Sequence, residues 1–485
     1  MPKDWFKLEN LTPLASIPKG GKIHFIGVCG VAMGQLAVAL SERGYQVSGS
    51  DKEFYEPMGS FLSSSKIELC RGYDANNIPA GVDLIVIGNA ISYGHPEVER
   101  IEQENLPYTC FPRALQETVI AGKHSIVASG THGKSTTTAM IASSLLKLDK
   151  DPSYFVGGVS PELRTSLNAG SGTMSVVEGD EYDDVFFSKK AKFVHYAPNT
   201  AVINAIEFDH ADLYPNLDAI VSAFEALVRL LPDDGVGICC IDFPVVKELT
   251  SRWSSLTKAR CLTFGQSAEA DFRICNWSQN GARQSFTVEN TEEGTWKYDL
   301  PLVGEYNARN ALACTLACRE VGCSPEAVIT TLSSYKSVKR RQQVHVANDQ
   351  IVLIEDFAHH PTAVAETVAA VKKAYPDRPL CAVFEPRSNT SRRKVFEQQY
   401  IAAFGAADRV ILANVQARAI DSGHDLLNVE ELAATMTTAG KPTTAIESAD
   451  AIFEEIVAHT KGQVVLVMSN GSFGGLPQKL IEHFT

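Results

Sequence analysis

The chain has 485 residues, of which 45% are hydrophobic and 21% charged, enough apolar sequence for about three packed domains. It carries 44 Lys and Arg against 57 Asp and Glu, a net charge of −13, which disfavours a general nucleic-acid binder because such proteins need a basic face. No stretch is long and apolar enough to span a bilayer, and residues 1–5 lack the basic-then-apolar order of a signal peptide. We therefore expect a cytoplasmic protein with neither membrane nor nucleic acid as a partner.

The first segment alternates strands and helices as nucleotide-binding folds do. An apolar strand at 22–26 leads into a glycine-rich turn at 27–34, an apolar helix and a second strand at 45–49. A further apolar strand at 83–88 continues the alternation. This order predicts a βαβ unit in a first domain that ends near residue 122.

A phosphate-binding loop opens the second segment, between the apolar run 125–128 and a helix at 136–147. Glycines let backbone N–H groups face phosphate oxygens, Lys134 brings a positive charge to the transferring phosphate, and the Ser135 hydroxyl can ligate Mg²⁺. The helix adds the positive end of its dipole. Ala128 takes the place of the glycine that usually opens the pattern. We therefore predict that the chain binds ATP and Mg²⁺ through Gly130, Thr131, His132, Gly133, Lys134, Ser135 and Thr136.

Acidic residues and a histidine follow two strands of the same segment. Glu178 comes after two valines, and His210 follows the strand at 200–204. The carboxyl ends of parallel strands meet at the edge of a sheet where ligands bind. Because Mg²⁺ prefers oxygen ligands, we expect a buried, functional Glu178, and His210 could complete a second cation site. A solvated acidic turn is an equally good interpretation for Glu181, Asp183 and Asp184.

The end of the second segment looks different. Short strands with polar alternation at 258–304 predict an antiparallel appendage ahead of a helix at 308–321. Asn307 and Asn310 open that helix three residues apart, so they can bind a polar ligand on one face, although Asn also caps helices. The near-helical spacing of three cysteines predicts buried helix residues rather than metal ligands, namely Cys314, Cys318 and Cys323.

The third segment again alternates strands and helices, which predicts a mostly parallel sheet. Its expected strands are 350–356, 380–384, 409–412 and 464–468. The fold class is therefore α/β with three domains. They are a Rossmann-like domain at 1–122, a central ATPase-like domain with the appendage at 123–337, and a second Rossmann-like domain at 338–485.

Polar groups gather at the strand ends of the third segment. Arg341 can bind a phosphate in a bidentate way, and Asp356 can accept ribose hydroxyls. The adjacent His359 and His360 are not expected to share a metal ion, because neighbouring loop positions rarely reach one ion together. The basic, hydroxyl-rich stretch 385–393 is either a site for an anionic substrate group or a solvated loop.

These motifs, in this order, resemble the Mur ligase family of bacterial cell-wall enzymes over essentially the whole chain. Those enzymes use ATP to join an amino acid or peptide to a UDP-muramyl carboxylate. The resemblance implies catalytic roles for Lys134, Glu178 and His210, and Mg²⁺ ligands at Ser135, Glu178 and His210. It adds Asn307, Asn310, Arg341 and Asp356 to the ATP site. It implies a UDP-sugar site at Gly27, Cys29, Gly30, Met33, Gly34, Ser50 and Asp51.

Within the family, several stretches are similar to the branch that attaches the tripeptide L-alanyl-γ-D-glutamyl-meso-diaminopimelate to UDP-N-acetylmuramate. They are 54–58, 193–196, 207–212, 356–362, 385–390 and 468–471. The implied reaction passes through an acyl phosphate and serves peptidoglycan recycling, and the murein tripeptide would be bound by Arg387, Ser388 and Asn389. Some members use a modified lysine after the His210 segment, and the absence of lysine from 211–228 fits this branch and the alanine-adding one.

Three alternatives stay open. The L-alanine-adding ligase of the same family is the nearest. A dehydrogenase would need fuller dinucleotide spacing in the glycine turn, and the phosphate loop argues against it. A non-catalytic UDP-sugar sensor would fit two departures from the family pattern, Tyr306 in place of His and Ala205 in place of Asn. The sequence does not distinguish a monomer from a homodimer.

Overall fold

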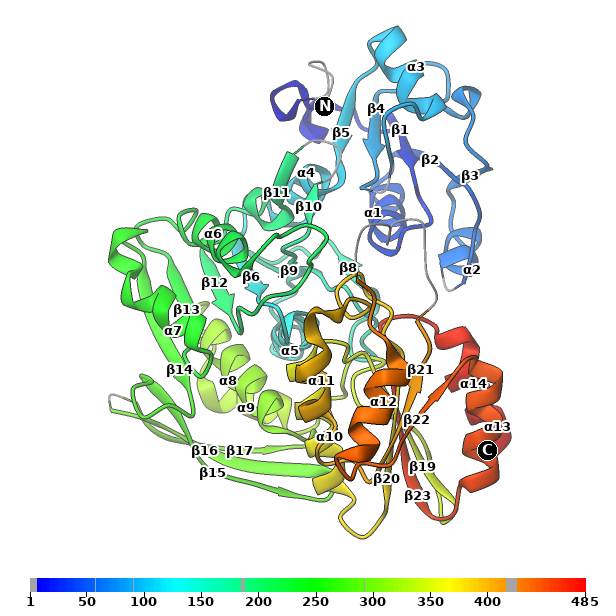
Figure 1. Ribbon diagram of the computed structural model, residues 1–485. Coiled ribbons are helices and arrows are strands. Elements are labelled where there is room, and N and C mark those ends of the chain that lie inside the picture. Colours follow the sequence, from blue (N-terminus) through cyan, green and yellow to red (C-terminus); the bar gives the residue numbers. More distant parts are fainter. Residues whose placement is uncertain (1–6, 57, 90, 185–187, 292, 416–424) are drawn as a thin grey trace.

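A computed structural model describes residues 7–485 except 57, 90, 185–187, 292 and 416–424. Three sheets flanked by helices follow one another along the chain (Figure 1). This confirms the predicted α/β class with three sheet-based parts, while boundaries at exactly 122 and 337 stay predictions. Among the described residues, no helix has both the length and the apolar character needed to cross a membrane.

The N-terminal sheet has five parallel strands in the order β3-β2-β1-β4-β5. Its central strands are buried along nearly their whole length, as expected for a parallel sheet covered on both faces. The predicted βαβ unit is therefore confirmed. The strands are β1 (Lys22–Ile26), β2 (Gln46–Asp51), β3 (Glu68–Arg71), β4 (Leu84–Ile87) and β5 (Tyr108–Cys110). The helices are α1 (Val31–Glu42), α2 (Met58–Ser63), α3 (Pro96–Glu104) and α4 (Phe111–Leu115).

The central sheet has ten strands in the order β17-β16-β15-β14-β13-β12-β6-β9-β7-β8. Its strands are β6 (His124–Ser129), β7 (Ser153–Phe155), β8 (Leu167–Asn168), β9 (Met174–Gly179), β12 (Thr200–Ile203), β13 (Val236–Cys240), β14 (Arg260–Gly265), β15 (Phe272–Asn280), β16 (Arg283–Asn290) and β17 (Gly294–Leu300). A separate two-stranded ribbon comprises β10 (Asp183–Asp184) and β11 (Ser188–Ala191). The helices are α5 (Lys134–Lys147), α6 (Leu217–Val228), α7 (Pro244–Ser251), α8 (Glu305–Arg319) and α9 (Pro325–Leu332).

The predicted antiparallel appendage is confirmed for β15, β16 and β17 but not for β14. Strand β14 runs parallel to β13, and β15 starts parallel to β14, so only β15, β16 and β17 pair antiparallel. These strands also extend the central sheet rather than forming a separate unit. Their polar alternation arises because one face packs in the core with α8 while the other meets solvent. Cys314, Cys318 and Cys323 are all buried in that core, which confirms the prediction for the first two, while Cys323 lies after the end of α8 rather than on a helix.

The C-terminal sheet has six strands in the order β18-β19-β23-β20-β21-β22, and only β18 is antiparallel. The mostly parallel sheet is therefore confirmed. The strands are β18 (Gln343–Ala347), β19 (Ile351–Asp356), β20 (Leu380–Phe384), β21 (Arg409–Ala413), β22 (Thr443–Ile446) and β23 (Gln463–Met468). The helices are α10 (Pro361–Ala374), α11 (Glu397–Ala403), α12 (Val429–Thr438), α13 (Ala449–His459) and α14 (Leu476–Phe484).

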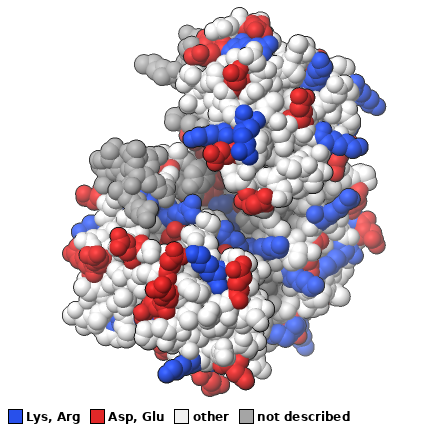
Figure 2. Space-filling view, turned by 90° about the vertical axis from the view of Figure 1, so that its right-hand side faces the viewer, with Lys and Arg blue, Asp and Glu red and all other residues white. Residues whose placement is uncertain are grey.

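Strand β15 also holds the C-terminal part of the molecule against the centre. The Gln279 side-chain amide donates to the Ala370 carbonyl on α10 at 2.9 Å. The Lys373 ammonium lies 4.2 Å from the centre of the Trp277 ring. Figure 1 shows β15 and α10 side by side at the bottom of the molecule. On another face, Figure 2 shows a hollow between the upper and lower parts of the molecule, with Lys and Arg side chains beside it.

Candidate active site

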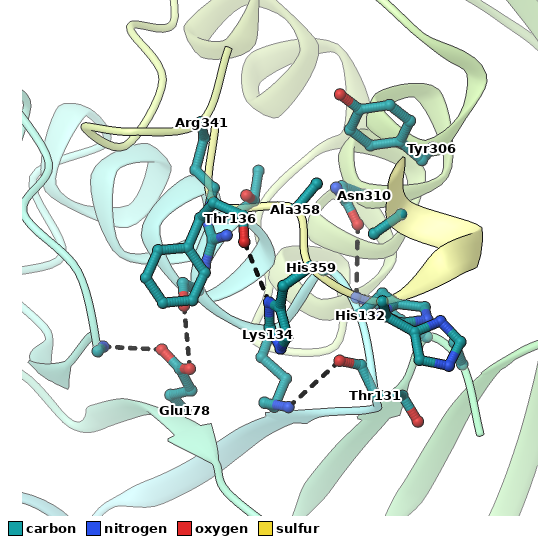
Figure 3. A pocket seen from close by; sticks show the side chains of 18 of the residues that line it. Thr131, His132, Lys134, Thr136, Glu178, Tyr306, Asn310, Arg341, Ala358 and His359 are labelled. Atoms are coloured by element: carbon teal, nitrogen blue, oxygen red, sulfur yellow. Dashed lines mark hydrogen bonds between the residues drawn. The ribbon is translucent and has the colours of Figure 1, made fainter. Parts of the chain in front are cut away.

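One pocket is lined by residues from all three parts of the chain. Val31 and Ala32, at the start of α1, represent the N-terminal part, and the central and C-terminal sheets supply the remaining walls. Figure 3 shows Lys134, Glu178 and Thr131 on one side of the pocket and Arg341, Ala358 and His359 on the other. The predicted ATP and Mg²⁺ residues that line it are Thr131, His132, Gly133, Lys134, Ser135, Thr136, Glu178, His210, Asn307, Asn310, Arg341 and Asp356.

The phosphate loop runs from the end of β6 to the start of α5. Gly133 has φ of +79°, and a Cβ there would come within 2.5 Å of the Asn310 amide oxygen and 2.8 Å of the Asn204 amide nitrogen. Only glycine fits this left-handed, crowded position. The Thr131 N–H donates to the Ala205 carbonyl at 2.8 Å. Because this contact uses only backbone atoms, it is kept although Ala205 replaces the Asn of the family pattern.

Lys134 and His210 share one carboxylate oxygen that the sequence analysis did not assign to the site. The Lys134 ammonium and His210 Nε2 each lie 2.8 Å from Glu181 Oε1. Glu181 is only 1% exposed and Asp183 only 5%. The solvated acidic turn is therefore wrong for both residues, because Glu181 is the buried counter-charge of Lys134, while the side chain of Asp184 lies outside the described residues. The sequence signal was the position of Glu181 three residues after Glu178.

The charges of this cluster sustain one another. Burial opposes the charged form of Lys134, but the nearby Glu181 and Asp180 outweigh it and raise the pKa of the ammonium. Burial also opposes the ionised Glu181, but Lys134 and the His210 hydrogen bond outweigh it and lower the pKa of that carboxyl. The pKa of His210 is raised, since its contacts with Glu181 and Asp209 exceed the effect of burial. Lys134 and Glu181 are thus both charged at neutral pH.

The donors beside this cluster fit Mg²⁺. The Ser135 hydroxyl donates to Glu178 Oε1 at 3.0 Å, while Glu178 Oε2 accepts the Gly157 N–H at 2.7 Å. The second oxygen of Glu181, Oε2, is buried and has no hydrogen-bond partner among the described residues. An orphaned carboxylate oxygen beside hydroxyl and carboxylate donors suits a hard cation. Glu178 is half-buried rather than buried as predicted, because its carboxylate faces the pocket.

The asparagine pair lies on α8 as expected. The Asn310 amide donates to the Asn307 amide oxygen at 3.3 Å, and the Asn307 amide donates to the Val303 carbonyl at 2.8 Å. The Asn204 amide donates to the Thr137 hydroxyl at 2.8 Å and so stands close to the same group. Tyr306, the other departure from the family pattern, lines the pocket above Asn310 (Figure 3).

The opposite wall comes from the C-terminal part. The Arg341 guanidinium lies 4.4 Å from the centre of the Phe357 ring. Asp356 is buried at the end of β19, and its two oxygens accept the N–H groups of Gln342 and Ala358, each at 2.7 Å. Burial raises the pKa of Asp356, and Arg341 only partly offsets this. Ribose binding by Asp356 stays a prediction.

The predicted UDP-sugar residues gather around the turn between β1 and α1 and the neighbouring end of β2, outside this pocket. The N–H groups of Gly27 and Val28 both donate to the Ser50 carbonyl, and the Cys29 N–H donates to Asp51 Oδ2 at 2.8 Å. Gly30 caps α1, in which Met33 and Gly34 are buried. Behind the turn, the Ser50 hydroxyl donates to the fully buried Glu97 at 2.6 Å. The sequence analysis missed Glu97, whose only signal was an acid just after the first residue of α3.

The predicted peptide-binding residues also lie outside the pocket, on a loop between the central and C-terminal parts. Arg387 is exposed and packs on Gly471, where a Cβ would come 2.0 Å from Nη1. The Asn389 amide donates to the Asp212 carboxylate at 2.8 Å, and the Ser388 hydroxyl bonds within its own loop. Asn470, next to Gly471, does line the pocket, so this loop borders its rim.

Known proteins match the chain along nearly its whole length. The Mur ligase family models match in three pieces: the catalytic domain at 22–122, the middle domain at 128–318 and the glutamate ligase domain at 339–471. The UDP-N-acetylmuramate–L-alanyl-γ-D-glutamyl-meso-2,6-diaminoheptandioate ligase of Escherichia coli (strain K12) is 34% identical over 95% of this chain and 98% of its own. The UDP-N-acetylmuramate–L-alanine ligase of Paenarthrobacter aurescens (strain TC1) is 31% identical over 97% and 99%.

A solved structure agrees with these sequence matches. The crystal structure of a murein peptide ligase from Psychrobacter arcticus 273-4 superposes with a TM-score of 0.70 at 30% identity, covering 96% of this chain and 99% of that one. The phosphate loop, the acidic cluster behind it and the C-terminal wall all fall within the matched regions. The chain belongs to the Mur ligase family of ATP-dependent, amide-bond-forming ligases.

Proposed function

We propose that this chain uses ATP and Mg²⁺ to join the tripeptide L-alanyl-γ-D-glutamyl-meso-diaminopimelate to UDP-N-acetylmuramate in peptidoglycan recycling. The observation that carries the proposal is the single pocket lined by the phosphate loop, the start of α1 and the C-terminal wall. A ligase of this kind must bring a nucleotide, an acid and an amine to one place. The 34% identity to a relative named for this tripeptide reaction selects the substrates.

The chemistry requires the acid to be activated before the amide forms. Joining a carboxylate to an amine in water is uphill, so the lactyl carboxylate of UDP-N-acetylmuramate attacks the γ-phosphorus of ATP. The bond to the β–γ bridging oxygen breaks, ADP leaves, and an acyl phosphate forms. Negative charge spreads over the phosphoryl oxygens in this step, and the Lys134 ammonium is placed to stabilise it. The amine of the tripeptide's alanine then attacks the acyl carbon, and phosphate leaves.

Ser135, Glu178 and Glu181 are the residues suited to hold Mg²⁺, with His210 joined to them through Glu181. When bound, the ion supplies positive charge beside the phosphates. The chain's own task is to keep water from the acyl phosphate, and Arg341 and His359 close the pocket opposite Lys134 for this purpose (Figure 3).

The start of α1 supports placing the sugar nucleotide at the N-terminal turn. Val31 and Ala32 reach the pocket, so a diphosphate bound at the turn before α1 would extend its muramyl group toward the phosphate loop. On the other side, Arg387 is the residue we assign to a carboxylate of the incoming peptide. It stands at the rim, where a ligand longer than a single amino acid would reach.

The L-alanine-adding reaction is the second candidate, favoured by the 31% identity to a relative with that name. Purified full-length protein with ATP, Mg²⁺ and UDP-N-acetylmuramate, given either tripeptide or L-alanine, separates the two by phosphate release. We expect release with the tripeptide and little with L-alanine. Release with L-alanine alone would replace the tripeptide assignment, and nucleotide binding without release under both conditions would indicate a non-catalytic sensor. The cytoplasmic location stays a prediction.

A further inference from the structure

A second group of possible metal ligands lies beside the phosphate loop, separate from Ser135 and Glu178. It comprises the side chains of His132 in the loop, Glu207 after β12 and His360 just before α10. His132 Nε2 is 2.6 Å from Glu207 Oε2, and His360 Nδ1 is 3.9 Å from the same oxygen. All three ligand atoms lie within 4.8 Å of one another.

Outer contacts aim these atoms at a common point. The His360 Nε2–H donates to the Phe208 carbonyl at 3.2 Å, which leaves a lone pair on Nδ1 facing the group. That nitrogen also accepts the Thr362 N–H, in a long hydrogen bond of 3.3 Å that a bound ion would replace. The Thr362 hydroxyl donates to Glu207 Oε1 at 2.9 Å, which leaves Oε2 toward the two imidazoles. Such hydrogen bonds to the far side of each ligand are typical of protein metal sites.

The donor set selects a class of ion. Two imidazole nitrogens and one carboxylate oxygen match Zn²⁺ and similar transition metals and leave a fourth position open, whereas Mg²⁺ prefers oxygen alone. Around a tetrahedral zinc ion, neighbouring ligand atoms are about 3.4 Å apart. The distances of 2.6 and 3.9 Å lie on either side of this value, so small side-chain rotations would suffice.

The three side chains are partly buried, yet the group they form is accessible from a neighbouring pocket. His360 is 6% exposed, while His132 and Glu207 are half-buried. A second, shallower pocket lined by Glu207, His360 and Thr362 opens beside the group.

We propose that His132, Glu207 and His360 bind one divalent transition-metal ion such as Zn²⁺. Because His132 belongs to the phosphate loop and His360 to the start of α10, the ion would tie the central and C-terminal parts together beside the ATP site. The site stands on these three side chains and does not depend on the ligase reaction proposed above. It uses only His360 of the adjacent histidine pair, in line with the expectation that His359 and His360 do not share one ion.

Cobalt titration tests the site directly. Metal-free full-length protein is titrated with Co²⁺ in excess Mg²⁺, which occupies oxygen-donor sites, and visible absorption is recorded. We expect one Co²⁺ per chain with the bands of a four- or five-coordinate ion. His360→Gln should weaken binding about tenfold or more. The matched control His345→Gln, whose ring pairs with Glu355 on β19, should bind like the wild type. Absence of bands, or equal binding in both variants, would overturn the proposal.

X-ray absorption of the Zn²⁺-loaded wild type provides a second measurement that needs no variant. We expect nitrogen and oxygen neighbours at about 2.0–2.1 Å, whereas ligation by cysteine would give sulfur at about 2.3 Å. The chain has 11 cysteines, so a sulfur signal would mean that zinc binds elsewhere and would sink the His132–Glu207–His360 assignment.

Discussion

The two walls of the pocket handle charge in different ways. On the central wall, Lys134, Glu181 and His210 neutralise one another within one sheet-based unit. On the C-terminal wall, the Asp356 carboxylate accepts hydrogen bonds from two backbone N–H groups of the same wall. Arg341 stacks on Phe357 with no ion pair to any described residue. The central wall is therefore complete by itself, while the C-terminal wall offers a guanidinium that still lacks an anion. We therefore expect the phosphates of the nucleotide to couple the two walls.

The largest expected effect comes from removing the central cation. Lys134→Ala should reduce tripeptide-dependent phosphate release by about 10²–10³-fold, because a preorganised charge at the transferring phosphate is lost. Lys258→Ala, which removes an exposed lysine paired with Asp233, serves as the control. If Lys134→Ala kept more than a tenth of the wild-type rate, the central wall would not be the catalytic one.

Arg341→Ala tests the other wall. We expect the KM for ATP to rise by about 10- to 100-fold, the value of a hydrogen bond to a charged group, with a smaller change in the KM for the tripeptide. Arg229→Ala, on the exposed end of α6, is the matched control. An unchanged KM for ATP would show that Arg341 does not pair with the nucleotide and would remove the contrast between the walls.

Glu181→Gln sharpens the description of the central wall. The amide keeps the shape but loses the charge and the orphaned carboxylate oxygen. We expect the Mg²⁺ concentration for half-maximal activity to rise about tenfold. Glu269→Gln, on an exposed pair, should leave it unchanged. A wild-type Mg²⁺ dependence in Glu181→Gln would restrict this carboxylate to pairing with Lys134.

The smallest expected effect is at the rim. Arg387→Ala should raise the KM for the tripeptide about three- to fivefold, as expected for an exposed ion pair, and leave the KM for ATP unchanged. Gly471→Ala should act in the same direction, because the added Cβ would displace the Arg387 side chain. Unaltered tripeptide kinetics in both variants would exclude this loop from peptide binding.

Sequence reasoning reached furthest where chemistry and local pattern coincide. The phosphate loop, Glu178 and the asparagine pair follow from strand–loop–helix order, and the structure brings them to one pocket. It failed for Glu181 because a run of acids after a strand reads the same whether it is solvated or buried against a lysine 47 positions earlier. Only three-dimensional packing makes that pairing visible.

The appendage shows the same limit for the fold. Its polar alternation correctly indicated short antiparallel strands, yet alternation does not reveal which strand pairs with which, so the continuity of these strands with the central sheet was missed. The His132–Glu207–His360 group was equally out of reach, since its members are separated by 75 and 153 positions.

Because β15 is continuous with the central sheet, its contact with α10 is a fixed point for the C-terminal part. Trp277 and Gln279 of β15 contact the C-terminal end of α10. The N-terminal end of the same helix follows His360, which lines the pocket. Rotation about this contact would move the pocket end of α10 further than the end that meets Trp277 and Gln279. The outlying strands thus contact the C-terminal part directly, and we expect these contacts to restrict how far the pocket can open.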